Sequence, residues 1–114
     1  LGSAREVLDL EPDLSAISDA MVGAIGAHPA GHAFDFEMRT FAPGAGVPED
    51  PVCGSMNASV GQWFTATGQV TGRYRVSQGA RLGRAGEITV TPDDDGTVWV
   101  GGATHTLFRG SALV

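Results

Sequence analysis

The chain has 114 residues and a formal net charge of −6, because thirteen acidic side chains outnumber seven Arg and there is no Lys. This length suits a single domain, residues 1–114, whose core needs no disulfides. The basic residues are scattered, so we expect no nucleic-acid partner. No apolar run approaches the ~20 residues that span a bilayer and the N-terminus does not resemble a signal peptide, so we expect no membrane partner. Because the chain begins at Leu1 and not at Met, we expect that a segment upstream of it is missing.

The first third of the chain predicts one short helix and a β-hairpin. Ser3-Ala4-Arg5-Glu6 is a capping box, which indicates a helix over about Ala4–Asp9, and Pro12 suits the first turn of a second helix. The stretch Ala20–His28 could continue that second helix or form a strand. Its two glycines weaken a helix, and a turn at Pro29-Ala30-Gly31 would pair it with the next segment, so we favour the strand.

The segment His32–Phe41 has the clearest strand pattern in the chain. Apolar and polar side chains alternate along it with the period of a β-strand. One predicted face carries Phe34, Phe36, Met38 and Thr40, and the other carries Asp35, Glu37 and Arg39.

The segment Met56–Ala66 predicts a helix of small and apolar residues that is buried on most sides, with Trp63 and Phe64 in the core. The rest of the chain is β-like, and Asp93-Asp94-Asp95-Gly96 is a strong hairpin signal. The further predicted strands are Tyr74–Gln78, Glu87–Thr91, Thr97–Val100 and Thr104–Arg109. The predicted fold class is α+β, with a mostly antiparallel curled sheet or barrel around one central helix.

A glycine- and proline-rich loop, Ala42–Ser55, precedes the predicted central helix. If Ser55 is the N-cap, the next backbone N–H groups have no acceptor within the helix. Together with the helix dipole they would attract a carboxylate or a phosphate. This loop is therefore the candidate site.

The stretch Phe41–Ser55 resembles the signature of the phenazine-biosynthesis PhzF-like family, whose members share the diaminopimelate epimerase fold. Gln78-Gly79, Gly83-Arg84-Ala85-Gly86 and Val98–Gly102 support the resemblance, which covers nearly the whole chain. It implies the C-terminal half of a two-domain protein whose active site lies between the domains. The N-terminal half of such proteins supplies a proton-transferring glutamate that has no counterpart here.

The resemblance also implies roles for particular residues. Asp50 matches the active-site aspartate in Glu-Asp-Pro, and its alternative is an Asx-type turn before Pro51. Ser55 matches a substrate-contacting serine, although a plain N-cap explains it equally well. With Gly54 and Met56 it completes the expected substrate-binding set.

Cys53 departs from the family pattern, in which threonine is common at this place. Racemases and epimerases that are distantly related by fold carry a catalytic cysteine at the same helix start, where the thiolate is favoured. Cys53 is therefore either an acid/base group or a small, inert residue filling the space of threonine. As the single cysteine, it excludes an internal disulfide and indicates a reducing, cytoplasmic setting.

The function implied by the resemblance is that of an isomerase or epimerase that transfers a proton on a small carboxylate without a metal or organic cofactor. We expect this chain alone to be inactive and to form a homodimer or a complex with an N-terminal half. The alternative is a non-catalytic module that binds a small acid or associates with itself.

Other candidate residues are weaker. His28, His32 and His105 are isolated in sequence, so we expect surface or hydrogen-bonded side chains rather than metal ligands. Arg84 could meet an anion, but a solvated loop is the simpler interpretation. The acidic run at 93–95 resembles a calcium site only superficially, and we expect a solvated turn.

Overall fold

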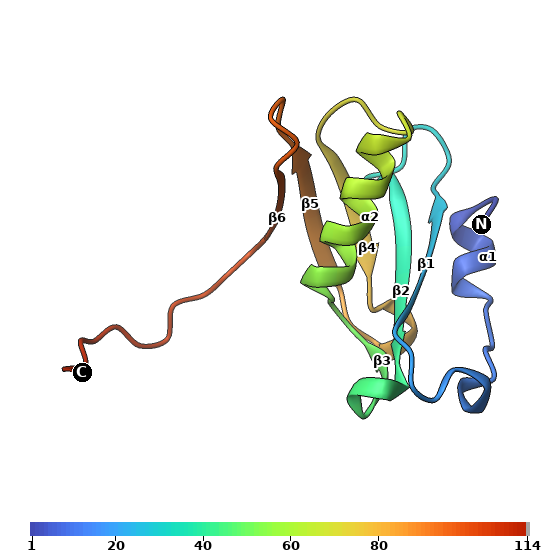
Figure 1. The fold of residues 1–114 in the computed structure, drawn as a ribbon, viewed down its shortest axis with the longest axis horizontal. Coiled ribbons are helices and arrows are strands. Elements are labelled where there is room, and N and C mark those ends of the chain that lie inside the picture. Colours follow the sequence, from blue (N-terminus) through green and yellow to red (C-terminus); the bar gives the residue numbers. More distant parts are fainter. Residues whose placement is uncertain (114) are drawn as a thin grey trace.

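The computed structural model describes residues 1–113 as an α+β fold, with six strands in one mixed sheet and two α-helices (Figure 1). The helices are α1 (Ala4–Leu8) and α2 (Gly54–Ala66). The strands are β1 (Val22–Ala27), β2 (Phe36–Ala42), β3 (Val47–Asp50), β4 (Tyr74–Gln78), β5 (Gly86–Pro92) and β6 (Val98–Gly102). Short 3₁₀ helices cover Leu14–Ile17, Pro43–Ala45 and Ala80–Leu82.

The sheet has the order β1-β2-β4-β5-β6, and β3 also pairs with β2. Only β2 and β4 pair in parallel, because β3 and α2 lie between them in the chain and form the crossover. The other pairs are antiparallel. The α+β class is therefore confirmed, and the sheet is open rather than closed into a barrel.

The main core lies between α2 and one face of the sheet. It contains Met38, Phe64, Tyr74, Val76, Ile88 and Val90. Gly61 lets α2 approach closely, because a Cβ there would lie 2.7 Å from Cγ1 of Val98. The expectation of a helix buried on most sides is wrong: an open sheet covers only one side of α2, and Trp63 is 52% exposed. Phe64, in contrast, is in the core as expected.

The opposite face of the sheet packs against α1, which buries the polar face of β2. Glu37 and Arg39 are 3% and 5% exposed. The Arg39 guanidinium donates to both carboxylate oxygens of Glu49, at 2.9 and 2.8 Å, which holds the pKa of Arg39 above its usual value. It also donates to the carbonyl oxygens of Val7 at 3.3 Å and Leu10 at 2.7 Å, at the end of α1. Arg39 thus joins α1, β2 and β3.

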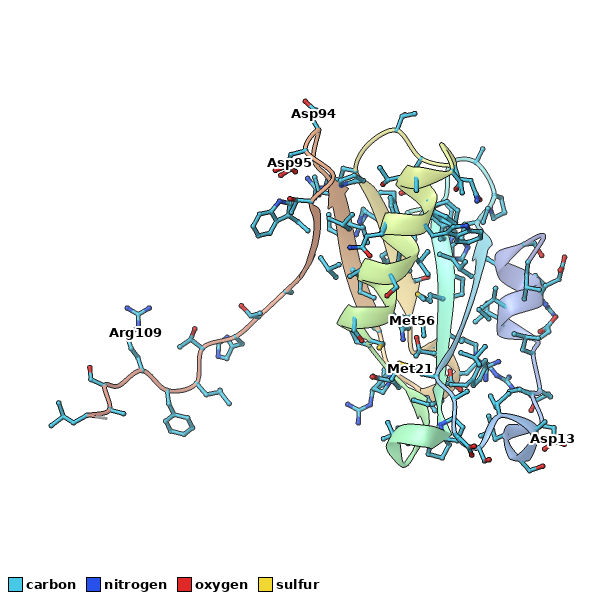
Figure 2. All side chains as sticks on the ribbon, in the orientation of Figure 1. Asp13, Met21, Met56, Asp94, Asp95 and Arg109 are labelled. Atoms are coloured by element: carbon cyan, nitrogen blue, oxygen red, sulfur yellow. The ribbon has the colours of Figure 1, made fainter. Side chains whose placement is uncertain are left out.

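Two predicted turns and caps are confirmed in detail. Ser3 Oγ accepts from the N–H of Glu6 at 3.2 Å, which is one half of the predicted capping box, while the Glu6 carboxylate accepts from the N–H of Gly2 at 3.2 Å instead of that of Ser3. The β5–β6 turn has Gly96 at φ +88°, and the Thr97 N–H lowers the pKa of Asp95 by bonding its carboxylate. Figure 2 shows Asp94 and Asp95 at the tip of this hairpin.

Two other predicted elements are wrong. The stretch after Pro12 forms only the 3₁₀ turn Leu14–Ile17, while the strand prediction for 20–28 is confirmed by β1. The predicted strand Thr104–Arg109 is an extended segment that pairs with none of residues 1–113 and leads away from the sheet (Figures 1 and 2). Phe108 in it is 93% exposed.

Tyr74 provides a test of the core. Its hydroxyl is buried and finds no hydrogen-bond partner among residues 1–113, and an unpaired buried hydroxyl costs free energy. Tyr74→Phe removes the hydroxyl, so the free energy of unfolding in urea should stay equal or rise by up to about 1 kcal/mol. A loss of more than about 1 kcal/mol would show that the hydroxyl makes a stabilising contact.

The titration of the same side chain gives a second measurement. Burial raises the pKa of Tyr74 from 10.0 to about 12, so the folded state favours the neutral phenol. Ionisation of Tyr74 therefore leaves the free energy of unfolding unchanged below pH 10. Above that pH the free energy of unfolding falls, because the unfolded chain ionises first, and the fall is complete once the pH has passed about 12. Because Tyr74 is the single tyrosine, the phenolate absorbance reports it alone, and an ordinary midpoint in the folded protein would contradict its burial.

The Arg39–Glu49 pair predicts a strong stability effect. Either Arg39→Met or Glu49→Met leaves one buried charge unpaired and should cost about 3–5 kcal/mol in urea unfolding. The double variant should cost less than the sum, because it leaves no charge behind. As a control, Arg5→Met in the exposed Arg5–Asp9 pair should cost less than about 1 kcal/mol. Equal losses at Arg39 and Arg5 would show that the buried pair is unimportant.

Candidate functional site

The five residues predicted for the site lie between the end of β3 and the first turn of α2: Asp50, Cys53, Gly54, Ser55 and Met56. The chain leaves β2, turns at Gly46 with φ +77°, and returns as β3 antiparallel to β2. β3 ends at Asp50, and Pro51, Val52 and Cys53 connect it to α2. This return places the carboxylate residue close to the start of the central helix.

The helix begins earlier than predicted. Cys53 is the N-cap, since the Asn57 N–H donates to the Cys53 carbonyl at 3.1 Å and Cys53 has extended backbone angles. Ser55 therefore lies within the first turn, and the prediction of Ser55 as N-cap is wrong. The Cys53 side chain makes no capping hydrogen bond to the helix, so the free N–H groups are left for other acceptors.

Three successive backbone N–H groups remain unpaired at this helix start. Those of Gly54, Ser55 and Met56 donate to no acceptor among residues 1–113. With the positive end of the helix dipole they are suited to bind an anion. The Met56 side chain packs against β1, where a Cβ at Gly23 would lie 2.8 Å from its sulfur, so only its backbone is available to a ligand.

Only one carboxylate oxygen of Asp50 accepts a hydrogen bond from residues 1–113. Its Oδ1 accepts from the Val52 N–H at 3.0 Å, which is the Asx-type turn foreseen as the alternative interpretation. Its Oδ2 accepts no hydrogen bond from residues 1–113, and the side chain is half-buried. The turn therefore orients the carboxylate without using both oxygens.

Cys53 is buried, with 5% exposure, and its thiol is free. The sulfur lies 3.5 Å from the Ser55 hydroxyl, so these two side chains share the first turn of α2. Both the acid/base and the inert interpretation of Cys53 are compatible with this position.

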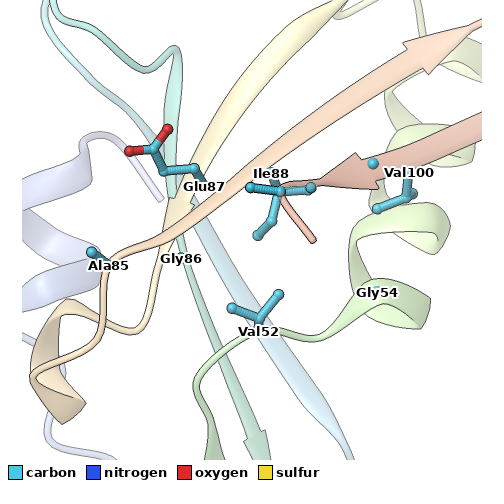
Figure 3. Close-up of a pocket in the computed structure, with 10 residues that line it drawn as sticks. Val52, Gly54, Ala85, Gly86, Glu87, Ile88 and Val100 are labelled. Atoms are coloured by element: carbon cyan, nitrogen blue, oxygen red, sulfur yellow. The ribbon is translucent and has the colours of Figure 1, made fainter. Parts of the chain in front are cut away.

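A cavity of about 640 Å³ opens beside the helix start (Figure 3). Val52 and Gly54 form one side of it and face Ile88 and Val100, while the Glu87 side chain points away from them. Glu87 is the one ionisable residue in the lining and pairs with Arg75 at 3.3 Å. No basic side chain lines this cavity, so an anion in it could be met only by backbone N–H groups. Of the five predicted site residues, the structure brings Gly54 alone to its wall.

A buried network of two side-chain amides lies behind the loop and was not predicted from the sequence. Gln78 and Asn57 are both 1% exposed and hydrogen-bond to each other at 3.0 Å. They contact the peptide groups of Asp50 and Cys53. The one signal in the sequence was the Gln78-Gly79 pair within the family resemblance; neither periodicity nor charge singles out these amides.

The weaker candidates have structural roles. His28 Nε2 lies 3.2 Å from Glu37 and 3.1 Å from Ser77, and the ring stacks on His32 at 3.8 Å, so these histidines are hydrogen-bonded as expected. His105 is exposed on the extended segment. Among residues 1–113 no group of His, Cys, Asp or Glu could hold a metal ion. Within the same range, no helix combines the length and the apolar character needed to cross a bilayer.

The chain has an α+β fold with unpaired N–H groups at the start of its central helix, and comparison with known proteins assigns its family. The family described as phenazine biosynthesis-like protein matches residues 1–110. The chain therefore belongs to this family, and the resemblance found in the sequence is confirmed.

Similar proteins include several that are named isomerases. The chain is 34% identical to an uncharacterized isomerase, YddE, of Escherichia coli O157:H7, with 88% of this chain and 38% of that protein covered. It is 36% identical to an uncharacterized isomerase of Deinococcus radiodurans, with 82% and 34% covered. Antisense-enhancing sequence 1 of Schizosaccharomyces pombe is 30% identical over the whole chain and 42% of its own length. The chain thus spans less than half the length of the curated relatives it matches.

Solved structures support the fold. A PhzF family protein of Enterococcus faecalis superposes with a TM-score of 0.65 at 24% identity, covering 93% of this chain and 43% of that protein. A PhzF family protein of Bacillus anthracis gives 0.56 at 23% identity, with 76% and 32% covered.

Proposed function

We propose that this chain is the C-terminal half of a cofactor-independent isomerase or epimerase that moves a proton at the carbon beside a carboxylate. The observation that carries the proposal is the set of unpaired N–H groups at Gly54, Ser55 and Met56, which begins four residues after Asp50. Membership of a family whose relatives include proteins named isomerases supports the reaction class. The reducing, cytoplasmic setting expected from the lone cysteine belongs to the same proposal.

The substrate carboxylate would accept hydrogen bonds from the N–H groups at the start of α2. When a base takes the proton from the adjacent carbon, the C–H electron pair moves toward the carboxylate and its negative charge grows. The same N–H groups and the helix dipole stabilise this charge, which lowers the barrier. A second acid then returns a proton to the carbon. Charge stabilisation by the backbone and proton transfer by side chains complete the step, so the proposal includes no metal or organic cofactor.

Asp50 is the proposed proton-transfer group on this side of the substrate. Its Oδ2 accepts no hydrogen bond from residues 1–113, while Oδ1 is held by the Val52 N–H. Cys53 is proposed as the second group of this half, because its thiol lies at the same helix start. The opposite base would come from the N-terminal half or a partner chain.

The proposal is tested by hydrogen exchange at the substrate carbon. The protein that contains this chain together with its N-terminal half is incubated in D₂O with a panel of free L- and D-amino acids, and the loss of the Cα proton signal is followed by NMR. Asp50→Asn should reduce the exchange rate by about 10²–10⁴-fold, because it cannot carry the proton. Asp94→Asn, the same change in the exposed β5–β6 turn, is the matched control.

The same assay decides the role of Cys53. Cys53→Ser keeps the size of the side chain but replaces the thiol by a far weaker acid, so exchange should fall by about 10²-fold. Unchanged exchange would remove Cys53 from the mechanism and leave Asp50. Unchanged exchange in Asp50→Asn as well would refute the proposed function.

We also propose that this half associates with a second chain. Val52, Trp63 and Trp99 are large apolar side chains about half exposed or more, and exposed apolar surface favours association. Light scattering on the isolated chain should give about twice the 11.7 kDa chain mass or more. A strictly monomeric profile over the accessible concentration range would contradict this part of the proposal.

A further inference from the structure

We infer that Gln78 is a positioning residue that fixes the separation between Asp50 and Cys53 by binding both ends of the loop that connects them. The inference rests on the proposed function of those two residues. Gln78 is the last residue of β4 and is 1% exposed, so its amide lies wholly behind the loop.

The hydrogen bonds of Gln78 reach one group at each end of this loop. Its Nε2 donates to the Asp50 carbonyl at 2.9 Å and to Thr40 Oγ1 at 3.2 Å. Its Oε1 accepts from the Cys53 N–H at 3.4 Å and from Asn57 Nδ2 at 3.0 Å. Both N–H groups and both lone pairs of the amide are therefore used.

These partners admit only one orientation of the amide. A peptide carbonyl can only accept and a peptide N–H can only donate. Rotating the Gln78 amide by half a turn would set its oxygen against the Asp50 carbonyl and its NH₂ against the Cys53 N–H. The distance between the two peptide groups is thus spanned by one rigid, planar side-chain group.

The network also excludes other conformations of the loop. Asn57 Nδ2 donates to the Cys53 carbonyl at 2.9 Å, so the helix-start peptide is held on its other side as well. The loop packs against glycines: a Cβ at Gly79 would lie 2.7 Å from the Pro51 oxygen, and one at Gly86 would lie 2.5 Å from Cγ2 of Val52. The loop is therefore in close contact with β4 and β5 and has little room to move.

The consequence for catalysis is geometric. Proton transfer requires the donor and acceptor atoms to lie within hydrogen-bonding distance of the reacting carbon, and a displacement of about 1 Å can cost about 10²-fold in rate. Gln78 touches none of the reacting atoms in the proposed mechanism. Its effect passes through the backbone of Asp50 and Cys53.

Replacement of the amide by a carboxyl group separates this role from simple packing. In Gln78→Glu the ionised side chain has no donor for the Asp50 carbonyl and places a negative oxygen against it. Protonation returns one O–H donor, and burial raises the pKa of a carboxyl group, so the neutral form is reached in mild acid. A positioning role thus predicts a defect that depends on pH, whereas a loss of packing would not.

The thiol of Cys53 reports the loop directly, because it is the single cysteine of this chain and is 5% exposed. The isolated chain is labelled with 4,4′-dithiodipyridine, which reacts with thiols in mild acid as well as at neutral pH. In Gln78→Glu the labelling rate should be about 10-fold above wild type at about pH 8 and return to within about 2-fold of it at about pH 5. Gln62→Glu, the same change on the exposed side of α2, should match wild type at both pH values.

Gln78→Met keeps the size of the side chain and removes every hydrogen bond, so it should label fast at both pH values while circular dichroism stays unchanged. Wild-type labelling of Gln78→Glu at both pH values would overturn the inference. Fast labelling of Gln78→Glu that persists in acid would also overturn it, because the restored donor would then have no effect.

The exchange assay distinguishes this inference from the proposed function. In the protein with both halves, Gln78→Glu should lose about 10²-fold of the exchange rate at about pH 8 relative to wild type and recover in acid. If labelling follows the expected pattern while both Asp50→Asn and Cys53→Ser keep full exchange, the proposed function fails and Gln78 is only a structural residue. If Asp50→Asn is inactive while Gln78→Glu keeps full exchange, the positioning role fails and the proposed function stands.

Discussion

The position of β3 depends on two hydrogen-bonded contacts, one at Glu49 and one at Asp50, that come from opposite faces of the sheet. Successive residues of a strand point to opposite faces. Glu49 is bound by the buried guanidinium of Arg39, at 2.9 and 2.8 Å, on the side that α1 covers. The backbone of Asp50 is bound by Gln78 at 2.9 Å on the side of α2. β3 is a short strand of four residues with one pairing partner, so these side-chain contacts are needed to fix it.

The Arg39 contact also explains how a helix as short as α1 is stabilised. A helix of five residues is too short to be stable alone. The guanidinium donates to the carbonyl oxygens of Val7 and Leu10 at the C-terminal end of this helix, where the dipole is negative. Glu49 compensates the charge, so the pair can be buried at low cost, although loss of either partner would leave an isolated charge. The order of the candidate loop is therefore coupled to packing on the far side of the sheet.

The sequence predicted the period of β2 correctly but not what covers its polar face. Alternation assigns Met38 and Arg39 to opposite faces, whereas burial of Arg39 depends on α1 and Glu49, which are distant in sequence. For the same reason, only part of the candidate site was predicted from the sequence. The loop and free N–H groups at a helix start follow from local patterns, and Asp50 follows from the family resemblance. The start of the helix at Cys53, whose N–H donates to Gln78, was not predicted. Capping preference favoured Ser55, and tertiary contacts overrode it.

The predicted strand at 104–109 fails for a different physical reason. Its composition favours an extended backbone, and the segment is indeed extended, but a strand also needs an edge with free N–H and C=O groups in the right register. Local propensity cannot supply that edge, and none of residues 1–113 pairs with this segment.

The proposed reaction needs proton-transfer groups on two sides of the substrate carbon. Epimerisation at a carbon removes a proton from one side and returns one to the other, so acid and base groups must face the carbon from different directions. Asp50 and Cys53 are three residues apart, and the backbone of both is hydrogen-bonded to the one amide of Gln78. In the proposed reaction, groups held so close together would act from one side of the substrate, so the second proton-transfer group would come from another domain or chain.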